Sequence, residues 1–202
     1  MSTLGDRLHR RIIYSRRIRQ LVRHLSALVP HGASVVDVGS GDGMLAATLL
    51  KARPDITIRG FDVLVRGETF VPVEPFDGAH IPLADGAVDI ALIVDVLHHT
   101  DDPGVVLAEA ARVARHGVVV KDHLREGFLA GPTLRFMDWV GNARHGVRLP
   151  YNYLSMAEWQ ALFAANRLVP EGWTEDLALY AAPADWLFGR RLHFTTRLVR
   201  RG

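Results

Sequence analysis

Apolar and polar positions alternate along this chain with two different periods. Apolar residues recur at helical spacing over residues 6–29, where Pro30 ends the pattern, and again over 44–52 and 103–115. Short β-branched and apolar runs predict buried strands at residues 34–38, 56–61, 87–94 and 118–120. Strands that alternate with helices predict a parallel sheet with helices on both faces.

Beyond residue 125 the pattern changes. We expect a helix over residues 134–140, a loop at 149–153, a capped helix over 155–166 and a final strand at 192–199. The chain has 202 residues, 49% of them apolar, which is enough for one substantial core and short for two domains. We therefore predict a single domain over 1–202, made of a basic N-terminal helix or lid (1–30), a cofactor-binding core (31–125) and a substrate lid with the C-terminal part (126–202).

The sequence contains no cysteine, which excludes a disulfide framework, a thiolate metal site and a cysteine nucleophile. This composition suits a reducing compartment, and we expect a cytoplasmic protein. The arginine-rich start leads into no apolar stretch of signal-peptide or membrane-spanning length, which favours a soluble, unprocessed chain.

Charge is unevenly distributed, although the net charge is only +2. Residues 1–24 contain seven arginines against the single acid Asp6. A helix of this kind most simply covers the core with its apolar face and turns its arginines to water. The alternative is a basic surface that makes weak contact with an anionic membrane, or that binds nucleic acid or an acidic substrate.

A glycine-rich turn follows the first predicted strand. Residues 35–43 read VVDVGSGDG, and Gly39, Gly41 and Gly43 let the backbone approach a ligand closely. Asp62 ends the second predicted strand 19 residues after the turn, where a carboxylate can accept both ribose hydroxyls of an adenosine. The turn and the acid together predict a nucleoside-containing ligand at the first crossover of the sheet.

Local detail separates two classes of such ligand. In a nicotinamide site the last glycine of G-x-G-x-x-G, counted from Gly39, would fall on Met44, which is too bulky for close packing of helix on strand. Asp37 lies inside the strand, where a buried acid needs donors such as the turn amides or a ligand ammonium. S-adenosylmethionine carries an ammonium group and NAD does not, so the former is favoured.

These motifs together resemble the class I S-adenosylmethionine-dependent methyltransferases, in particular the small-molecule, methyltransferase-11-like subgroup. The resemblance covers about residues 33–122 and rests on VVDVGSGDG, on Phe61–Asp62 and on DGAHIPLADGAVDIALIVDVLHHTDDP at 77–103. It implies an α/β fold with a Rossmann-like doubly wound sheet of about seven strands, mostly parallel with an antiparallel last strand.

The same resemblance implies S-adenosylmethionine as cofactor and S-adenosylhomocysteine as product. The methionine part would lie against the glycine turn, and Asp62 would accept the ribose hydroxyls. The adenine would lie against Val63 with its amino group near Asp77–Gly78, and Asp95 would border cofactor and substrate. The expected cofactor-binding residues are Asp37, Gly39, Ser40, Gly41, Gly43, Asp62, Val63, Asp77, Gly78, Asp95 and Val96.

One segment departs from the family pattern. Only VLVRGETFVPVEPF separates Asp62 from Asp77, where the family usually has a full helix, and Gly67, Pro72 and Pro75 within it exclude a normal helix. We therefore expect a loop to build the adenine edge of the pocket.

Candidate catalytic groups follow the fourth and fifth strands of the fold, where side chains would face the methyl group. His98 and His99 occupy the first place, and His123 occupies the second, directly after Lys121 and Asp122. A neutral imidazole can take the proton of a hydroxyl or phenol, and we rank His123 first as general base. In the competing interpretations, His98 and His99 only shape the pocket and the 121–123 segment is a salt-bridged surface cluster.

We expect no metal site. A divalent ion on His98, His99, Asp101 and Asp102 is the weaker alternative, because consecutive residues rarely point at one centre. The two aspartates are expected instead to cap the helix that begins at Pro103.

Two further segments are candidates for covering the site. Residues 136–155 mix aromatic with polar side chains, as in a pocket lid, and the alternative is a plain packing helix with a turn. By analogy with the fold, Tyr14, Arg16 and Arg17 of the first helix would close over the cofactor.

These features predict a methyltransferase that acts on a small-molecule acceptor, at oxygen rather than nitrogen or carbon. The Asn-Pro-Pro-aromatic tetrapeptide of amino-methylating nucleic-acid enzymes does not follow the fourth strand, so DNA is not expected as a partner, whereas RNA is not excluded. The alternatives are a non-catalytic S-adenosylmethionine-binding domain and a membrane-surface partner protein that uses the basic first helix.

Overall fold

The computed structural model describes residues 4–142 and 150–201. The helical segments are α1 (Leu4–Leu28), α2 (Met44–Ala52), the single 3-10 turn η1 (Leu97–His99), α3 (Pro103–Val113), α4 (Ala130–Asn142), α5 (Met156–Ala165) and α6 (Ala184–Phe188). The strands are β1 (Ser34–Val38), β2 (Thr57–Asp62), β3 (Val73–Pro75), β4 (Ile90–Val94), β5 (Val118–His123), β6 (Leu168–Thr174) and β7 (His193–Arg200). Helices and strands alternate through most of the chain, as the hydrophobic pattern predicts.

All these strands belong to one sheet in the order β3-β2-β1-β4-β5-β7-β6. The pairings from β3 to β5 are parallel, whereas β7 is antiparallel to both of its neighbours, β5 and β6. The prediction of a mostly parallel, doubly wound sheet with an antiparallel last strand is therefore confirmed. The chain reverses its direction of travel across the sheet between β1 and β4, and this reversal opens a crevice at the carboxyl ends of these two strands.

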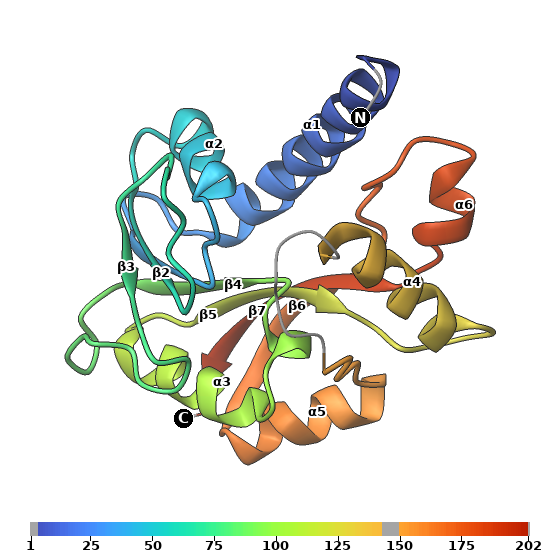
Figure 1. Ribbon diagram of the computed structural model, residues 1–202. Coiled ribbons are helices and arrows are strands. Elements are labelled where there is room, and N and C mark those ends of the chain that lie inside the picture. The colour runs from blue at the N-terminus through green and yellow to red at the C-terminus, as the bar shows by residue number, and fades with distance from the viewer. Residues whose placement is uncertain (1–3, 143–149, 202) are drawn as a thin grey trace.

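Two apolar cores lie on opposite faces of the sheet. Val36 and Ile93 point into the core that includes Trp159 of α5, and their strand neighbours Val35 and Leu92 point into the core beneath α1 and α2. Figure 1 shows α1 and α2 on one side of the sheet and α3 and α5 on the other. Because both faces are covered, the central strands are almost continuously apolar rather than alternating.

The first helix packs against the sheet through part of its surface. Ile18, Leu21 and Leu25 are buried there, while Arg19 and Arg23 are exposed. This arrangement matches the interpretation of α1 as a helix that covers the core. No helix in the described part of the chain combines the length and apolarity needed to cross a bilayer.

The fold differs from the sequence expectation in two strands. β3 forms at 73–75, so that the strand expected as the third, which starts at Ile90, is the fourth in chain order. β6 was not expected at all, because Pro170 and Gly172 disfavour a strand. It forms because it lies at the edge of the sheet, where proline needs no ladder partner, and its register shifts between Glu171 and Trp173.

Candidate active site

The turn between β1 and α2 forms one wall of a cavity of about 410 Å³ at the crevice. Gly39 and Gly41 have φ angles of 75° and 60°, in the left-handed region that favours glycine. A Cβ atom at Gly39 would lie 2.4 Å from Val96 Cγ2, so only glycine lets the end of β1 come this close to the end of β4. The glycines therefore bring bare backbone to the cavity, as the motif predicts.

The structure brings together some of the predicted cofactor residues and places others around them. The predicted cofactor residues that line the cavity are Asp37, Gly39, Ser40, Gly41 and Asp95. Gly43, with φ 74°, precedes α2 and lies against Val71, and Val96 packs on the first glycine of the turn.

Asp62 at the end of β2 braces the glycine turn. Its Oδ2 accepts a hydrogen bond from the Gly41 amide at 2.7 Å, and its Oδ1 accepts one from the Leu64 amide at 2.8 Å. A carboxylate offers about four lone pairs, so these two bonds leave acceptor capacity for ribose hydroxyls. The acid is therefore placed next to the cavity rather than in its lining.

The expected adenine edge has no helix, as the prolines predict, but besides the loop it contains the short strand β3 at Val73–Pro75. Val63 is 65% exposed, and a Cβ on Gly78 would lie 3.1 Å from it, so the two residues face each other. The Asp77 carboxylate accepts hydrogen bonds from the Ala79 and His80 amides, which stabilise a turn and lower the pKa of this carboxyl. Sequence reasoning missed Arg66 of the same loop, which lines the cavity.

Asp37 is the buried acid of the cavity, with only 3% of its surface exposed. Burial, with a smaller contribution from the negative charge of Asp62, raises the pKa of Asp37 to about 7. The nearby Ser40 Oγ is also buried and has no hydrogen-bond partner in the described part of the chain. A ligand ammonium and a polar ligand atom would satisfy these two groups, so the residues present fit the methionine part of S-adenosylmethionine.

A cationic pair converges on Asp95 at the opposite wall. The Arg17 guanidinium of α1 lies 2.5 Å from Asp95 Oδ2, and the Lys121 ammonium forms an ion pair with Oδ1. Burial would raise the pKa of Asp95, but Lys121 and Arg17 outweigh it and hold that pKa well below its usual range. Of the residues expected to cover the cofactor, Arg17 thus lines the cavity, whereas Arg16 donates to the Ala178 carbonyl and the Tyr14 side chain lies outside the described residues.

Lys121, Asp122 and His123 are all buried, which excludes the surface-cluster interpretation. Lys121 Nζ also lies 3.3 Å from Nδ1 of His193. The other ring nitrogen of His193, Nε2, lies 3.2 Å from the Phe188 carbonyl oxygen. This geometry favours a neutral His193 with its proton on Nε2, in keeping with a pKa that burial and Lys121 hold well below the usual range. His193 gave no sequence signal, because it stands at the start of an ordinary final strand.

Asp122 connects β5 to η1. Its carboxylate accepts hydrogen bonds from the backbone amides of Leu97 and His123, at 3.0 and 2.7 Å, and lies 2.5 Å from His98 Nδ1. Burial alone would lower the pKa of His98, but the Asp122 charge outweighs it and raises that pKa to about 10. The structure therefore assigns His98 a structural, charged position rather than that of a free base.

The His123 ring makes its contacts through Nδ1. This atom lies 3.3 Å from His98 Nδ1, 3.5 Å from Asp122 Oδ1 and 3.7 Å from Asp95 Oδ1. Burial and the positive charge of His98 lower the pKa of His123 to about 4, so the ring is neutral at pH 7. His123 is 5% exposed, and neither it nor His98 or His99 is among the residues that line the cavity, so the histidines lie behind Asp95 rather than at the cavity surface.

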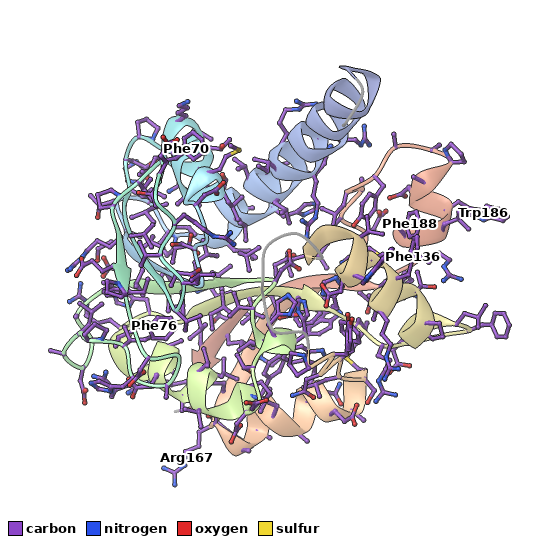
Figure 2. All side chains as sticks on the ribbon, viewed as in Figure 1. Phe70, Phe76, Phe136, Arg167, Trp186 and Phe188 are labelled. Atoms are coloured by element: carbon purple, nitrogen blue, oxygen red, sulfur yellow. The ribbon has the colours of Figure 1, made fainter. Side chains whose placement is uncertain are left out.

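The segment expected as a lid divides into an inner and an outer set. Asp138 of α4 accepts a hydrogen bond from the Tyr153 hydroxyl at 2.6 Å, and both side chains are buried. Phe136 and Trp139 are exposed instead, and Figure 2 shows Phe136 next to Phe188 of α6. The expected lid residue His145 lies outside the described residues.

The helix-cap prediction is confirmed at one of the two aspartates. Asp102 Oδ1 accepts a hydrogen bond from the Gly104 amide at 2.8 Å, and Pro103 follows as the first residue of α3. Asp102 is thus committed to the helix end and is not available to the histidines of η1.

Comparison with known proteins agrees with this geometry. Residues 36–120 match the model of a methyltransferase-domain family. An uncharacterised methyltransferase of Mycobacterium bovis is 29% identical over 185 residues, which cover 87% of this chain and 81% of the relative. Another, from Mycobacterium sp. strain JLS, is 29% identical over 136 residues, and the match spans 57% of this chain but only about half (48%) of the relative's length.

Solved structures share the fold at low identity. An S-adenosylmethionine-dependent methyltransferase of Mesorhizobium loti superposes with a TM-score of 0.65 at 16% identity, over 88% of this chain and 96% of that one. A methyltransferase of the same kind from Aquifex aeolicus gives 0.60 at 19% identity, over 87% of each chain. Residues 36–120 are therefore similar to a methyltransferase domain, and the chain has the fold of these S-adenosylmethionine-dependent methyltransferases.

Proposed function

We propose that this chain transfers the methyl group of S-adenosylmethionine to a hydroxyl oxygen of a small-molecule acceptor. The observation that carries the proposal is that the glycine-turn cavity lies next to a buried cluster of histidines, His98 and His123, at the ends of β4 and β5. Asp95 belongs to both, because it lines the cavity and faces Lys121 and His123.

Three groups would hold the cofactor. Asp37 would pair with its ammonium group, in a buried place where water screens the attraction little. Ser40 Oγ and the turn amides would bind the polar atoms of the methionine part. Asp62 would accept the ribose hydroxyls through the lone pairs that its bonds to the Gly41 and Leu64 amides leave free.

When bound, the cofactor supplies a methyl group on a sulfonium centre, so the protein has mainly to align the acceptor and take up its proton. We assign the second task to His123. Asp95 and Asp122 face its Nδ1 and favour the tautomer with the proton on that atom, which leaves the Nε2 lone pair for an acceptor hydroxyl. His98, paired with Asp122, and His99 would shape the pocket wall.

An oxygen acceptor follows from this base. An alcohol or phenol must lose its proton on methylation, whereas a neutral amine attacks with its own lone pair and gains little from a general base. The acceptor is expected to be small because α1 covers part of the cavity through Arg17, Ile18 and Leu21. A cytoplasmic location stays a prediction.

The test combines product analysis with one substitution. The purified chain is incubated with methyl-labelled S-adenosylmethionine and a panel of hydroxylated compounds beside their amine analogues, and products are identified by mass spectrometry. We expect O-methylated products, and a fall in turnover of about 100-fold or more for His123→Ala. Calorimetric affinity for S-adenosylmethionine should be unchanged in this variant, because the proposed cofactor contacts do not involve His123.

The control is His116→Ala, which removes a histidine whose side chain is 59% exposed and which precedes the start of β5, the opposite end of the strand from His123. Full turnover in His123→Ala would reject the assigned base. Cofactor binding without product on any acceptor would favour the binding-domain alternative, and flotation of the chain with anionic vesicles would favour the membrane-surface alternative.

A further inference from the structure

A second group of ligating side chains gathers beside the proposed base. His98 and His99 of η1 and Asp138 of α4 each offer a nitrogen or oxygen atom, and these atoms all lie within 4.8 Å of one another. The exposed fraction of their side chains is 1%, 16% and 6%, respectively. The sequence suggested only Asp101 and Asp102 as partners of the two histidines, whereas in the fold the partner is the Asp138 carboxylate of α4.

His98 is positioned like a metal ligand. Its Nδ1 lies 2.5 Å from Asp122 Oδ1, a carboxylate that fixes the ring and the tautomer. Its Nε2 is buried and has no hydrogen bond in the described part of the chain, with Asp138 Oδ1 at 3.5 Å as the facing atom. Without an ion His98 is charged and carries a proton on Nε2, and a bound cation would displace that proton and take its place between the ring and Asp138. Metal-bound histidines usually donate their other ring nitrogen to a carboxylate in this way.

The distances around Asp138 leave room for an ion. Zn²⁺ binds nitrogen and oxygen ligands at about 2.0–2.2 Å, and tetrahedral geometry then holds two ligand atoms about 3.4 Å apart. The Nε2 atoms of His98 and His99 lie 3.5 and 3.7 Å from Asp138 Oδ1. The neighbouring trio His98, Asp122 and His123 contains a direct contact of 2.5 Å, which leaves no space for an ion between its members.

We propose that His98, His99 and Asp138 bind a divalent transition-metal ion, with Zn²⁺ as the best chemical match. Two imidazoles and one carboxylate form a ligand set that zinc uses with a fourth position open. The Tyr153 hydroxyl fixes Asp138 through Oδ2, as Asp122 fixes His98. The two carboxylates also compensate the charge of a dication in this buried place. The proposal concerns ion binding and does not depend on the methyl-transfer reaction.

The test is a titration of the full chain, freed of metal by a chelator, with Co²⁺ as a spectroscopic substitute for Zn²⁺. We expect one equivalent of Co²⁺ to produce visible d–d bands, and Zn²⁺ to displace it. His99→Ala and Asp138→Asn should each weaken Co²⁺ binding at least tenfold. Asp122→Asn should also weaken it, about 10- to 100-fold, because it loosens the ring that presents Nε2.

The matched control is His31→Gln, which removes a histidine whose side chain is 92% exposed and outside the cluster. It should bind Co²⁺ like the wild type. Circular dichroism checks the fold of each variant, and if Asp138→Asn does not fold, His99→Ala decides, since its side chain is partly exposed and easier to remove. Absence of d–d bands in the wild type, or unchanged Co²⁺ affinity in folded His99→Ala, would overturn the proposal.

Discussion

At the scale of single residues, Asp37 is the acid whose ionisation the fold opposes most clearly. Its pKa is about 7 in the folded chain against an ordinary value of 3.8, because it is buried beside Asp62. Between these two pH values the unfolded chain has lost this proton while the folded chain still holds it. Raising the pH therefore favours unfolding, by up to about 1.4 kcal/mol per pH unit, until the folded carboxyl also ionises near pH 7.

In the Asp37→Asn variant the side chain at position 37 cannot ionise. Its free energy of unfolding should therefore lack the decrease with rising pH that Asp37 causes in the wild type. We expect the free energy of unfolding of the variant, minus that of the wild type, to increase as the pH rises from about 5 to 7 and to level off above it. Urea denaturation at a series of pH values measures this difference, and taking the difference cancels the titration of the other acids. A difference that does not change with pH would contradict the raised pKa.

At the scale of secondary-structure elements, Arg53 joins the ends of two helices. From the residue after α2, its Nη1 donates to the Ser26 and Val29 carbonyls at the end of α1, and its Nη2 donates to the Pro30 carbonyl. It also pairs with Asp55 at 2.7 Å. Carbonyls at a helix end lack partners within the helix, so one guanidinium here satisfies several at once.

We expect Arg53→Ala to lower the free energy of unfolding by about 2 kcal/mol, since charge-assisted bonds to half-buried carbonyls are lost. Urea denaturation measures the change. The control is Arg59→Ala, which breaks an ion pair with Glu74, both side chains being about half exposed, and a guanidinium contact 5.8 Å from the centre of the Phe61 ring. It should cost less than about 1 kcal/mol. Equal losses in the two variants would show that Arg53 acts as an ordinary surface charge.

Elements were predictable from the sequence wherever local pattern and final environment agree. The central strands are short apolar runs buried on both faces, and α2 is an apolar segment that buries Ala46 and Leu49. Ser155 caps α5 through a capping box that is visible in the sequence. β6 could not be predicted, because an edge position tolerates Pro170 and a register shift that local propensity counts against a strand. Edge position is a property of the whole sheet.

The candidate site was predictable where a motif marks a residue, and was not where a residue joins the site only through the tertiary fold. The β1–α2 turn is recognisable in the sequence from its glycines and from Asp37. Lys121, by contrast, is fully buried and pairs with Asp95, which also pairs with Arg17 of α1, and no local pattern encodes this arrangement. Asp138 of α4 lies 3.5 Å from His98, although His98 stands about 40 residues earlier in the chain, and only the tertiary fold brings the two together.

At the scale of the whole molecule, the cofactor cavity joins α1, the glycine turn and the end of β4 through Arg17, Asp37 and Asp95. A ligand that bridges these parts binds only the folded chain. At 100 times its Kd, S-adenosylhomocysteine should add about 2.7 kcal/mol, which raises the thermal midpoint of a chain of this size by roughly 5–11 °C. Differential scanning fluorimetry measures this rise.

Asp62→Ala should bind the ligand at least tenfold more weakly through loss of its ribose bonds, a change of about 1.4 kcal/mol or more. At the same ligand concentration this variant should therefore show about half of the wild-type rise or less. Asp85→Ala removes an acid whose side chain is 83% exposed and should keep the full rise. An unmoved midpoint in the wild type would contradict the cofactor cavity itself, whereas an undiminished rise in Asp62→Ala would contradict only the ribose assignment.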